Sequence, residues 1–271
     1  MAEGVLAGRI ALVTGASRGI GAEIARRFAA EGATVVATAR TAEPGGAPLE
    51  GSLADTVAAV AAAGGRAHAV AADLSRAADR VALVERVTAE HGPVDVLVNN
   101  AAVTWFTPIA DFPAKRAALM LEVQVTAPMH LAQLVLPAMR ERGSGAILNI
   151  SSRAAIHPQL PPTARAARGG TVYGMCKAAL ERFTTGLAAE VYSDGIAVNA
   201  LSPNRVVPTP GTVFHHLTTD DDPDAEPPAV MAEAALALCR PAADGSPPLT
   251  GRVTYSQDLL AELGIAAPAA G

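Results

Sequence analysis

The sequence predicts an α/β protein with one doubly wound parallel sheet of about seven strands and helices on both faces. Short apolar runs alternate with longer helical patterns, and the runs are apolar on both faces, as in parallel strands covered from two sides. A glycine-rich turn joins the first run to the first helical pattern. The expected strands cover residues 9–15, 33–40, 67–74, 94–100, 146–151 and 196–201, with a seventh near 252–256. The expected helices cover residues 20–31, 52–63, 76–91, 114–142 and 172–193.

The composition sets the domain count and excludes several partners. With 271 residues, 50% of them hydrophobic, the chain can form one large domain, which we expect to span residues 1–271. A net charge of −5 without a basic run argues against a nucleic acid or an anionic membrane as partner. Cys176 and Cys239 have neither metal-ligand nor disulfide spacing. No signal sequence is evident, and no apolar run approaches the roughly 18 residues of a membrane span, so we expect a cytoplasmic protein.

Three proline-containing segments with an irregular pattern follow the carboxyl ends of expected strands, where open α/β sheets bind their ligands. They cover residues 41–51, 153–170 and 202–228. We expect residues 153–170 and 204–228 to form loops over a substrate. The acidic run Asp220–Asp222 within the last segment is more simply a solvated turn.

The turn after the first strand has the composition of a dinucleotide-binding loop. Thr14–Gly21 reads TGASRGIG, and its glycines allow a tight turn and a close approach of backbone N–H groups to a pyrophosphate. The strand–turn–helix context makes this signal stronger than a glycine triplet alone. The residues expected to bind the cofactor here are Gly15, Ser17, Arg18, Gly19, Ile20 and Gly21.

The end of the second strand favours NADP(H) over NAD(H). NAD sites usually place a carboxylate there for the ribose 2′-hydroxyl, whereas this chain has Ala39 and Arg40. Arg18 and Arg40 together suit a 2′-phosphate, although two solvated surface arginines remain the alternative. Further cofactor contacts are expected after the third and fourth strands, where the same side chains would otherwise cap a turn or helix. These residues are Asp73, Leu74, Asn100 and Ala101.

Tyr173 and Lys177 form the expected catalytic pair. Their spacing of four places both side chains on one face of a helix, one turn apart, and the chain contains only two lysines. A nearby ammonium lowers the pKa of a phenol, which makes it an acid–base catalyst. Taken alone, the pair is equally consistent with a surface lysine and a half-buried tyrosine.

Five motifs, in this order, resemble those of the short-chain dehydrogenases/reductases, and the resemblance covers residues 7–260. The motifs are TGASRGIG, Asn99-Asn100-Ala101, Ile150-Ser151-Ser152, Tyr173-x-x-x-Lys177 and Val198–Pro203. The resemblance implies a Rossmann-type fold, a nicotinamide cofactor and hydride exchange between a small alcohol and its carbonyl compound. We therefore expect an NADP(H)-dependent alcohol dehydrogenase or carbonyl reductase.

The resemblance also implies roles for individual residues. Tyr173 would be the general acid or base, and Lys177 would lower its pKa and bind the nicotinamide ribose, so that both also line the cofactor site. Ser152 would hydrogen-bond the substrate oxygen. Pro203 and Val206 would contact the nicotinamide.

The sequence departs from the family pattern at several positions. Gln124 replaces the family's fourth catalytic residue, an Asn, and would support the proton relay through its amide. The 21 positions between Ser152 and Tyr173 exceed the family's usual spacing, and Asn204 replaces a glycine. The C-terminal stretch resembles a hydroxysteroid-dehydrogenase-like and terpenoid-alcohol subgroup. These departures keep other functions open, namely an NADP-binding regulatory or scaffold protein with a decayed site, an NAD-dependent member, or an epimerase or dehydratase.

Other features are weaker. His215-His216 lacks further ligands, so we expect no metal site. Trp105-Phe106 lines either a substrate pocket or the core. The expected helices at 114–142 and 172–193 are apolar on more than one face, which favours a homotetramer or, next, a homodimer.

Overall fold

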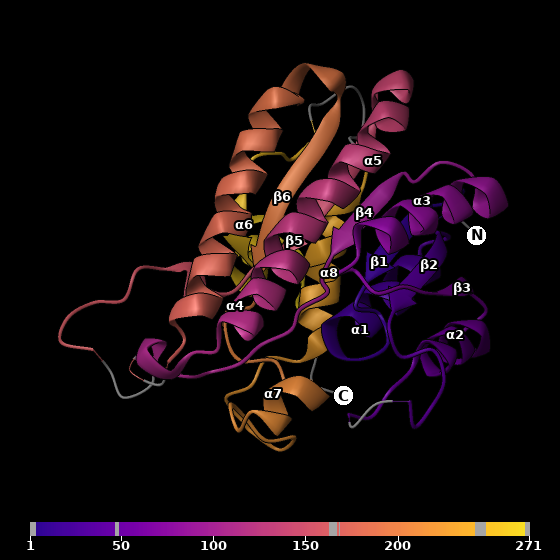
Figure 1. The fold of residues 1–271 in the computed structure, drawn as a ribbon. Helices are drawn as coiled ribbons and strands as arrows, with labels where there is room; N and C mark the ends of the chain where they lie inside the picture. The colour runs from indigo at the N-terminus through magenta and orange to yellow at the C-terminus, as the bar shows by residue number, and fades with distance from the viewer. Residues whose placement is uncertain (1–3, 47–48, 163–166, 168, 242–247, 269–271) are drawn as a thin grey trace.

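All seven expected strands are present and pair in parallel into one sheet (Figure 1). The computed structural model describes residues 4–46, 49–162, 167, 169–241 and 248–268. The strand order is β3-β2-β1-β4-β5-β6-β7, so the order reverses between β1 and β4. The strands are β1 (Ile10–Thr14), β2 (Thr34–Ala39), β3 (Arg66–Ala71), β4 (Val96–Asn99), β5 (Gly145–Ile150), β6 (Ile196–Ser202) and β7 (Val253–Tyr255).

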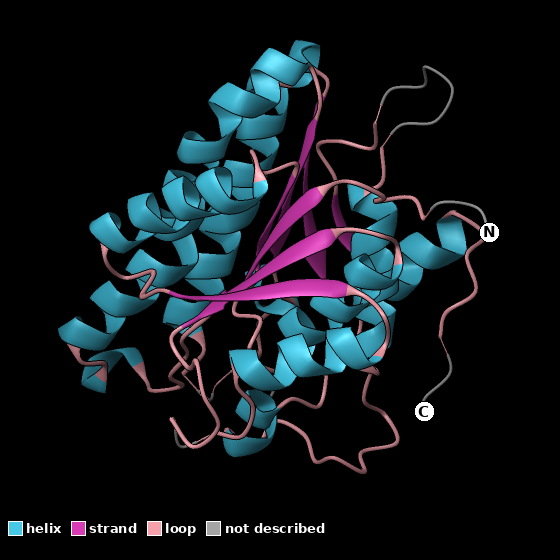
Figure 2. Cartoon of the chain, turned by 90° about the vertical axis from the view of Figure 1, so that its right-hand side faces the viewer, coloured by secondary structure: helices cyan, strands magenta, loops and turns pink. Residues whose placement is uncertain are grey.

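Helices cover both faces of the sheet, as the doubly wound prediction requires (Figure 2). One buried cluster joins the sheet to α1, α2 and α8, and a second joins the other face to α3, α5 and α6. The helices are α1 (Gly19–Ala30), α2 (Leu53–Ala62), α3 (Ala77–His91), α4 (Ala114–Leu121), α5 (Ala127–Arg142), α6 (Thr171–Glu190), α7 (Pro210–Phe214), α8 (Pro228–Cys239) and α9 (Ser256–Glu262). The 3₁₀ turns are η1 (Ile109–Asp111), η3 (Arg153–Ala155) and η4 (Tyr192–Asp194), while η2 (Glu122–Thr126) is a π turn.

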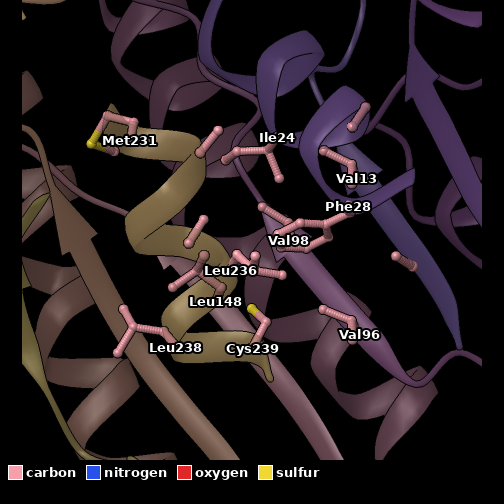
Figure 3. Packing of buried hydrophobic residues seen from close by; sticks show 14 of the residues in the cluster. Val13, Ile24, Phe28, Val96, Val98, Leu148, Met231, Leu236, Leu238 and Cys239 are labelled. Carbon is pink, nitrogen blue, oxygen red and sulfur yellow. The ribbon is translucent and has the colours of Figure 1, made fainter. Parts of the chain in front are cut away.

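Helix α8 is the main element that the sequence pattern did not predict. Its Met231 and Cys239 are buried, and they pack in one cluster with Ile24 and Phe28 of α1 (Figure 3). Nine of its twelve positions are buried, and all its side chains except Glu233 are apolar. A helix of this kind has no 3.6-residue polar–apolar period, which is the signal that revealed the other helices.

The segment Ala114–Arg142 runs without a break through α4, η2 and α5. Within the part of the chain that the structure describes, it is the single helix long and apolar enough to cross a membrane by length and composition alone. The sequence-based expectation that no run approaches that length is therefore wrong. Leu131, Val135 and Met139 of this helix are buried against the sheet, so we interpret its apolar character as core packing.

The strand register brings the expected site residues to one edge. Thr14 pairs with Thr38, Asn99 with Asn149, and Ile150 with Leu201, so these strands end at the same level. The segments that follow their carboxyl ends meet beside the point where the strand order reverses, and α4 and α7 lie at this end of the sheet (Figure 1). Ligands of open α/β sheets bind at such a switch point.

Candidate active site

The glycine loop between β1 and α1 is held close to the end of β4. Gly15 has φ +64°, which favours glycine, and a Cβ on Gly21 would come within 2.4 Å of both Asn100 Nδ2 and Gly15 O. Asn100 Nδ2 itself donates to Thr14 O at 2.9 Å and to Gly15 O at 3.1 Å. Only glycine therefore fits at Gly21, and Asn100 fixes the loop rather than projecting from it.

The start of α1 offers backbone N–H groups to an anion. Its N-cap, Arg18, makes no side-chain cap, and Ser17 is buried in the preceding turn. Ile20 packs partly against the core, and Gly19 lies against Thr209 of the 204–228 segment. A helix N-terminus with uncapped N–H groups attracts negative charge.

Arg18 and Arg40 lie close together at the edge of this loop. Burial, and next the charge of Arg40, lower the pKa of Arg18. Arg18 Nη2 donates to Gly51 O at 2.8 Å, but its Nε is buried and has no hydrogen-bond partner among the described residues. An anion placed here would satisfy that nitrogen and reduce the repulsion between the two cations, so the site fits a phosphate.

Asp73 and Leu74 serve local structure in this chain. Asp73 Oδ1 accepts from the backbone N of Ser75 at 3.0 Å and from its hydroxyl at 2.8 Å, which shapes the turn before α3. Leu74 is buried in the cluster on the α3 face. Ala101 N donates to Thr14 Oγ1 at 3.1 Å, which ties the end of β4 to β1. These contacts match the turn-forming alternative considered for Asp73.

Ser152, Tyr173 and Lys177 converge after β5. Ser152 follows that strand, whereas Tyr173 and Lys177 lie one turn apart on α6. The Ser152 hydroxyl lies close enough to the Tyr173 phenol to oppose the rise in its pKa. Lys177 Nζ lies 5.6 Å from the centroid of the Tyr173 ring and donates to Ile150 O at 2.8 Å. Ser152 thus forms one polar cluster with Tyr173 and Lys177, although it precedes them by 21 positions or more in the sequence.

Burial decides the protonation of this cluster. It raises the pKa of Tyr173, and the nearby Ser152 hydroxyl only opposes that change. Burial also lowers the pKa of Lys177 to about 8. Desolvation of the phenolate is the largest effect on the pKa of Tyr173 in the chain alone. That Lys177 lowers this pKa during the reaction stays a prediction.

The sequence analysis missed a carboxylate beside the cluster. Glu181 lies one turn beyond Lys177 on α6, and its Oε1 accepts from the Ser151 hydroxyl at 2.6 Å. Burial raises the pKa of Glu181, while Ser151 and the charge of Lys177 oppose the shift. Its spacing of four from Lys177 was the available signal. The pair fixes the backbone just before Ser152.

Gln124 lies in the π turn η2, in the middle of the long helix. It is 1% exposed, and its Nε2 donates to Val103 O at 2.9 Å. Its Oε1 is buried without a hydrogen-bond partner among the described residues. π turns often mark functional positions. The amide oxygen is thus an available acceptor within the core.

Asn204 and Glu226 fasten the two ends of the 204–228 segment. Glu226 is fully buried and accepts from the backbone N of Asn204 at 3.1 Å and from the Ser256 hydroxyl. Asn204 Oδ1 accepts from the backbone N of Gln257 at 2.7 Å, at the start of α9. Burial raises the pKa of Glu226 although these groups donate to it. Asn204 thus has a structural function that glycine lacks.

The remaining predicted residues lie on the same loops. Pro203 is half-buried directly after β6, and Val206 O accepts from Glu226 N at 2.9 Å. Residues 163–166 and 168 of the expected substrate loop 153–170 lie outside the described residues. Within the described residues, no group of three His, Cys, Asp or Glu side chains is arranged to hold a metal ion.

Comparisons with known proteins agree with this arrangement. The sequence pattern described as short chain dehydrogenase matches residues 9–215. Ketoacyl reductase HetN of Nostoc sp. is 36% identical over 208 residues, which are 77% of this chain and 67% of that protein. Short-chain reductase protein NovJ of Streptomyces niveus is 36% identical over 227 residues, covering 83% of this chain and 78% of that protein.

A solved structure also superimposes along most of the chain. The crystal structure of a metagenomic short-chain oxidoreductase in complex with NADP matches with a TM-score of 0.74 and 32% identity. The match covers 93% of this chain and 97% of that one. Together with the parallel seven-stranded sheet and the family pattern, these similarities show that the chain belongs to the short-chain dehydrogenase/reductase family.

Proposed function

We propose that the chain is an NADP(H)-dependent oxidoreductase that interconverts a small secondary alcohol and its ketone, or an aldehyde and its alcohol. The observation that supports this most is the cluster of Ser152, Tyr173 and Lys177 beside a glycine loop at one sheet edge. A related protein is named a ketoacyl reductase, and a structural neighbour is described in complex with NADP. The intact cluster argues against a scaffold protein with a decayed site.

The residues have complementary roles in carbonyl reduction. Because burial raises the pKa of Tyr173, its phenol keeps its proton at neutral pH and acts as the general acid toward the substrate oxygen. Ser152, beside the phenol, would donate a hydrogen bond to the same substrate oxygen and stabilise its developing charge. The nicotinamide, when bound, supplies the hydride. In alcohol oxidation the phenol and its partners would act in reverse.

Lys177 and Gln124 would support the proton transfer. Lys177 lies one helical turn from Tyr173, and its ammonium is held in place by its hydrogen bond to Ile150 O. It would stabilise negative charge on Tyr173 during the reaction. Gln124 offers a buried amide oxygen without a partner among the described residues, which suits a water-linked relay. We propose this relay in place of the family's asparagine.

Three features support NADP(H) over NAD(H). Arg18 has a buried Nε without a partner among the described residues, Arg40 is exposed beside it, and Ala39 stands where a carboxylate would repel a 2′-phosphate. Arg18, Arg40 and the uncapped N–H groups of α1 would therefore hold the phosphates. The competing proposal is an NAD-dependent member of the family. Such a member would be expected to have a carboxylate at this strand end, and this chain has none there.

The proposal is tested by following absorbance loss of NADPH and of NADH with a panel of small ketones and aldehydes. We expect turnover of at least one carbonyl compound, with a higher kcat/KM for NADPH than for NADH. Turnover with NADH but not NADPH would refute the cofactor assignment. Binding of NADPH without turnover of any compound in the panel would instead favour a regulatory protein.

A further inference from the structure

Aromatic residues are concentrated around the candidate active site. The chain has nine aromatic residues, only 3% of its length, and five of them belong to connected contacts around Tyr173. These five are Trp105, Phe106, Phe112, Tyr173 and Phe214. The two main hydrophobic clusters, in contrast, consist almost entirely of aliphatic side chains. In so aliphatic a protein, this concentration indicates a function for the rings at the site.

Three of these rings and the imidazole of His215 form a continuous row, which we call the aromatic row: Tyr173, Phe106, His215 and Phe214. The centroids of Phe106 and Tyr173 are 5.9 Å apart, and the planes meet at 68°. Phe106 and His215 are 5.5 Å apart at 83°, and His215 and Phe214 are 5.3 Å apart at 78°. Each pair thus has the edge-to-face geometry that aromatic rings prefer. The row leads from the catalytic phenol to the surface.

The row joins three segments that follow different strands. Phe106 comes after β4, Tyr173 lies in the first turn of α6, and His215 follows α7 in the 204–228 segment. Phe106 and His215 are half-buried, whereas Phe214 is 62% exposed. Ring surface therefore remains available to a ligand along the row, and most of all at its outer end.

The four side chains of the row are uncharged at neutral pH. Burial, and next His216, lower the pKa of His215, so its imidazole is neutral at pH 7. The nearby cation Arg116 is stacked over the Trp105 ring at 5.1 Å. A charged substituent would find no dedicated partner on this row.

We propose that the aromatic row selects substrates whose carbonyl carbon carries an aromatic ring over aliphatic compounds of equal size. This inference rests on the proposed function. The substrate oxygen must lie within about 3 Å of the Tyr173 hydroxyl to receive its proton. A substituent on the carbonyl carbon then lies beside Phe106, which is the next ring in the row after Tyr173. One favourable ring–ring contact is worth roughly a two- to tenfold preference beyond the area buried.

Matched pairs of ketones test the preference. Acetophenone and 2-octanone are both eight-carbon methyl ketones, one with a phenyl ring and one with a linear chain. The rates of NADPH oxidation give kcat/KM for each compound. We expect the ratio of the phenyl to the alkyl compound to be about threefold or more in the native protein. A ratio of one or less would overturn the inference while leaving the proposed function intact.

Variants assign the preference to the row. Phe106→Leu and His215→Leu keep apolar volume but remove a ring, so each should lower the phenyl-to-alkyl ratio toward one. Tyr192→Leu is the matched control, because Tyr192 is 68% exposed beyond the far end of α6. It should leave the ratio unchanged. An unchanged ratio in both Phe106→Leu and His215→Leu would also overturn the inference.

A binding measurement separates this inference from the proposed function. Trp105 is the chain's single tryptophan, and it packs in the same cluster as Tyr173. Its fluorescence can be titrated with 1-phenylethanol and with 2-octanol in the presence of NADPH, because an alcohol and the reduced cofactor cannot react with each other. Tighter saturable binding of 1-phenylethanol, lost in Phe106→Leu, would support the row even if turnover failed. Equal binding of the two alcohols would contradict it.

Discussion

Replacing Lys177 by Met should stabilise the chain at neutral pH, although it removes a residue of the proposed site. Lys177 is 3% exposed, and burial lowers its pKa from 10.5 to about 8. At about 1.4 kcal/mol for each pKa step, holding the charged form in the folded chain costs roughly 3 kcal/mol at pH 7. Met has nearly the same length and no charge, so the variant avoids this cost.

Part of this gain in stability is lost, because Lys177→Met also removes a hydrogen bond. Lys177 Nζ donates to Ile150 O at 2.8 Å, and removing a donor from a buried carbonyl costs about 1 kcal/mol. The net gain should be roughly 2 kcal/mol in the free energy of unfolding. For a chain of this size, that corresponds to a rise in Tm of roughly 5 °C.

The gain should depend on pH with a defined sign. Because the folded pKa of Lys177 lies below the unfolded value, the wild-type chain binds fewer protons when folded between about pH 8 and pH 10.5. Its stability therefore rises through this window as the buried amine becomes neutral. The advantage of the Met variant is complete below pH 8 and disappears as the pH approaches 10.5.

The assay is urea and thermal denaturation of both proteins without nucleotide, at pH 7 and at pH 9.5. The other lysine of the chain, Lys115, is exposed on α4, so Lys115→Met serves as the control and should change stability by less than about 0.5 kcal/mol. A Lys177→Met protein that is less stable than the wild type at pH 7 would refute the reasoning. So would an advantage that stays constant between the two pH values.

Three further predictions concern the cofactor, a buried carboxyl and assembly. Arg40→Ala should weaken NADP binding by about 1–3 kcal/mol, because a charge-assisted phosphate contact is lost, and should barely change NAD binding. Calorimetric titration measures both affinities. Tighter binding of NAD than of NADP to the native protein would contradict this prediction. Glu226→Gln should gain stability relative to the wild type as the pH rises from 5 to 7, because burial raises the pKa of Glu226 and its ionised form becomes costly. Chemical denaturation at the two pH values measures this, and an advantage larger at pH 5 would have the wrong sign. Met129 on α5 and Met175 on α6 are 41% and 49% exposed, so light scattering should give a tetramer or a dimer rather than the 27.4 kDa monomer.

The sequence predicted those elements of the fold whose local pattern of apolar residues and glycines reflects their environment in the folded chain. The glycine loop and the apolar runs at β1, β4 and β5 have strong local signals, and the structure confirms them. Helix α8 has no such signal, because it is buried on most sides and all its side chains except Glu233 are apolar. The π turn around Gln124 was equally invisible, since it does not alter the apolar pattern of the long helix.

The sequence predicted which residues form the site better than it predicted their pKa values. Spacing paired Tyr173 with Lys177, and the resemblance to the short-chain dehydrogenases/reductases added Ser152; the structure brings all three side chains to one place. The pKa of Tyr173 could not be inferred from spacing, because burial depends on every element packed around the phenol. The Ser151–Glu181 pair depends on how α6 approaches β5, which the sequence does not specify.

The central claim is that Tyr173 exchanges a proton with a carbonyl substrate. The most direct measurement compares native protein and Tyr173→Phe in NADPH oxidation with the best carbonyl compound, together with calorimetric binding of NADPH. The account predicts a loss of roughly 10²–10⁴ in kcat, as expected for removal of a general acid, with cofactor affinity changed by less than about fivefold. A Phe variant that keeps more than about a tenth of the native rate would contradict the account.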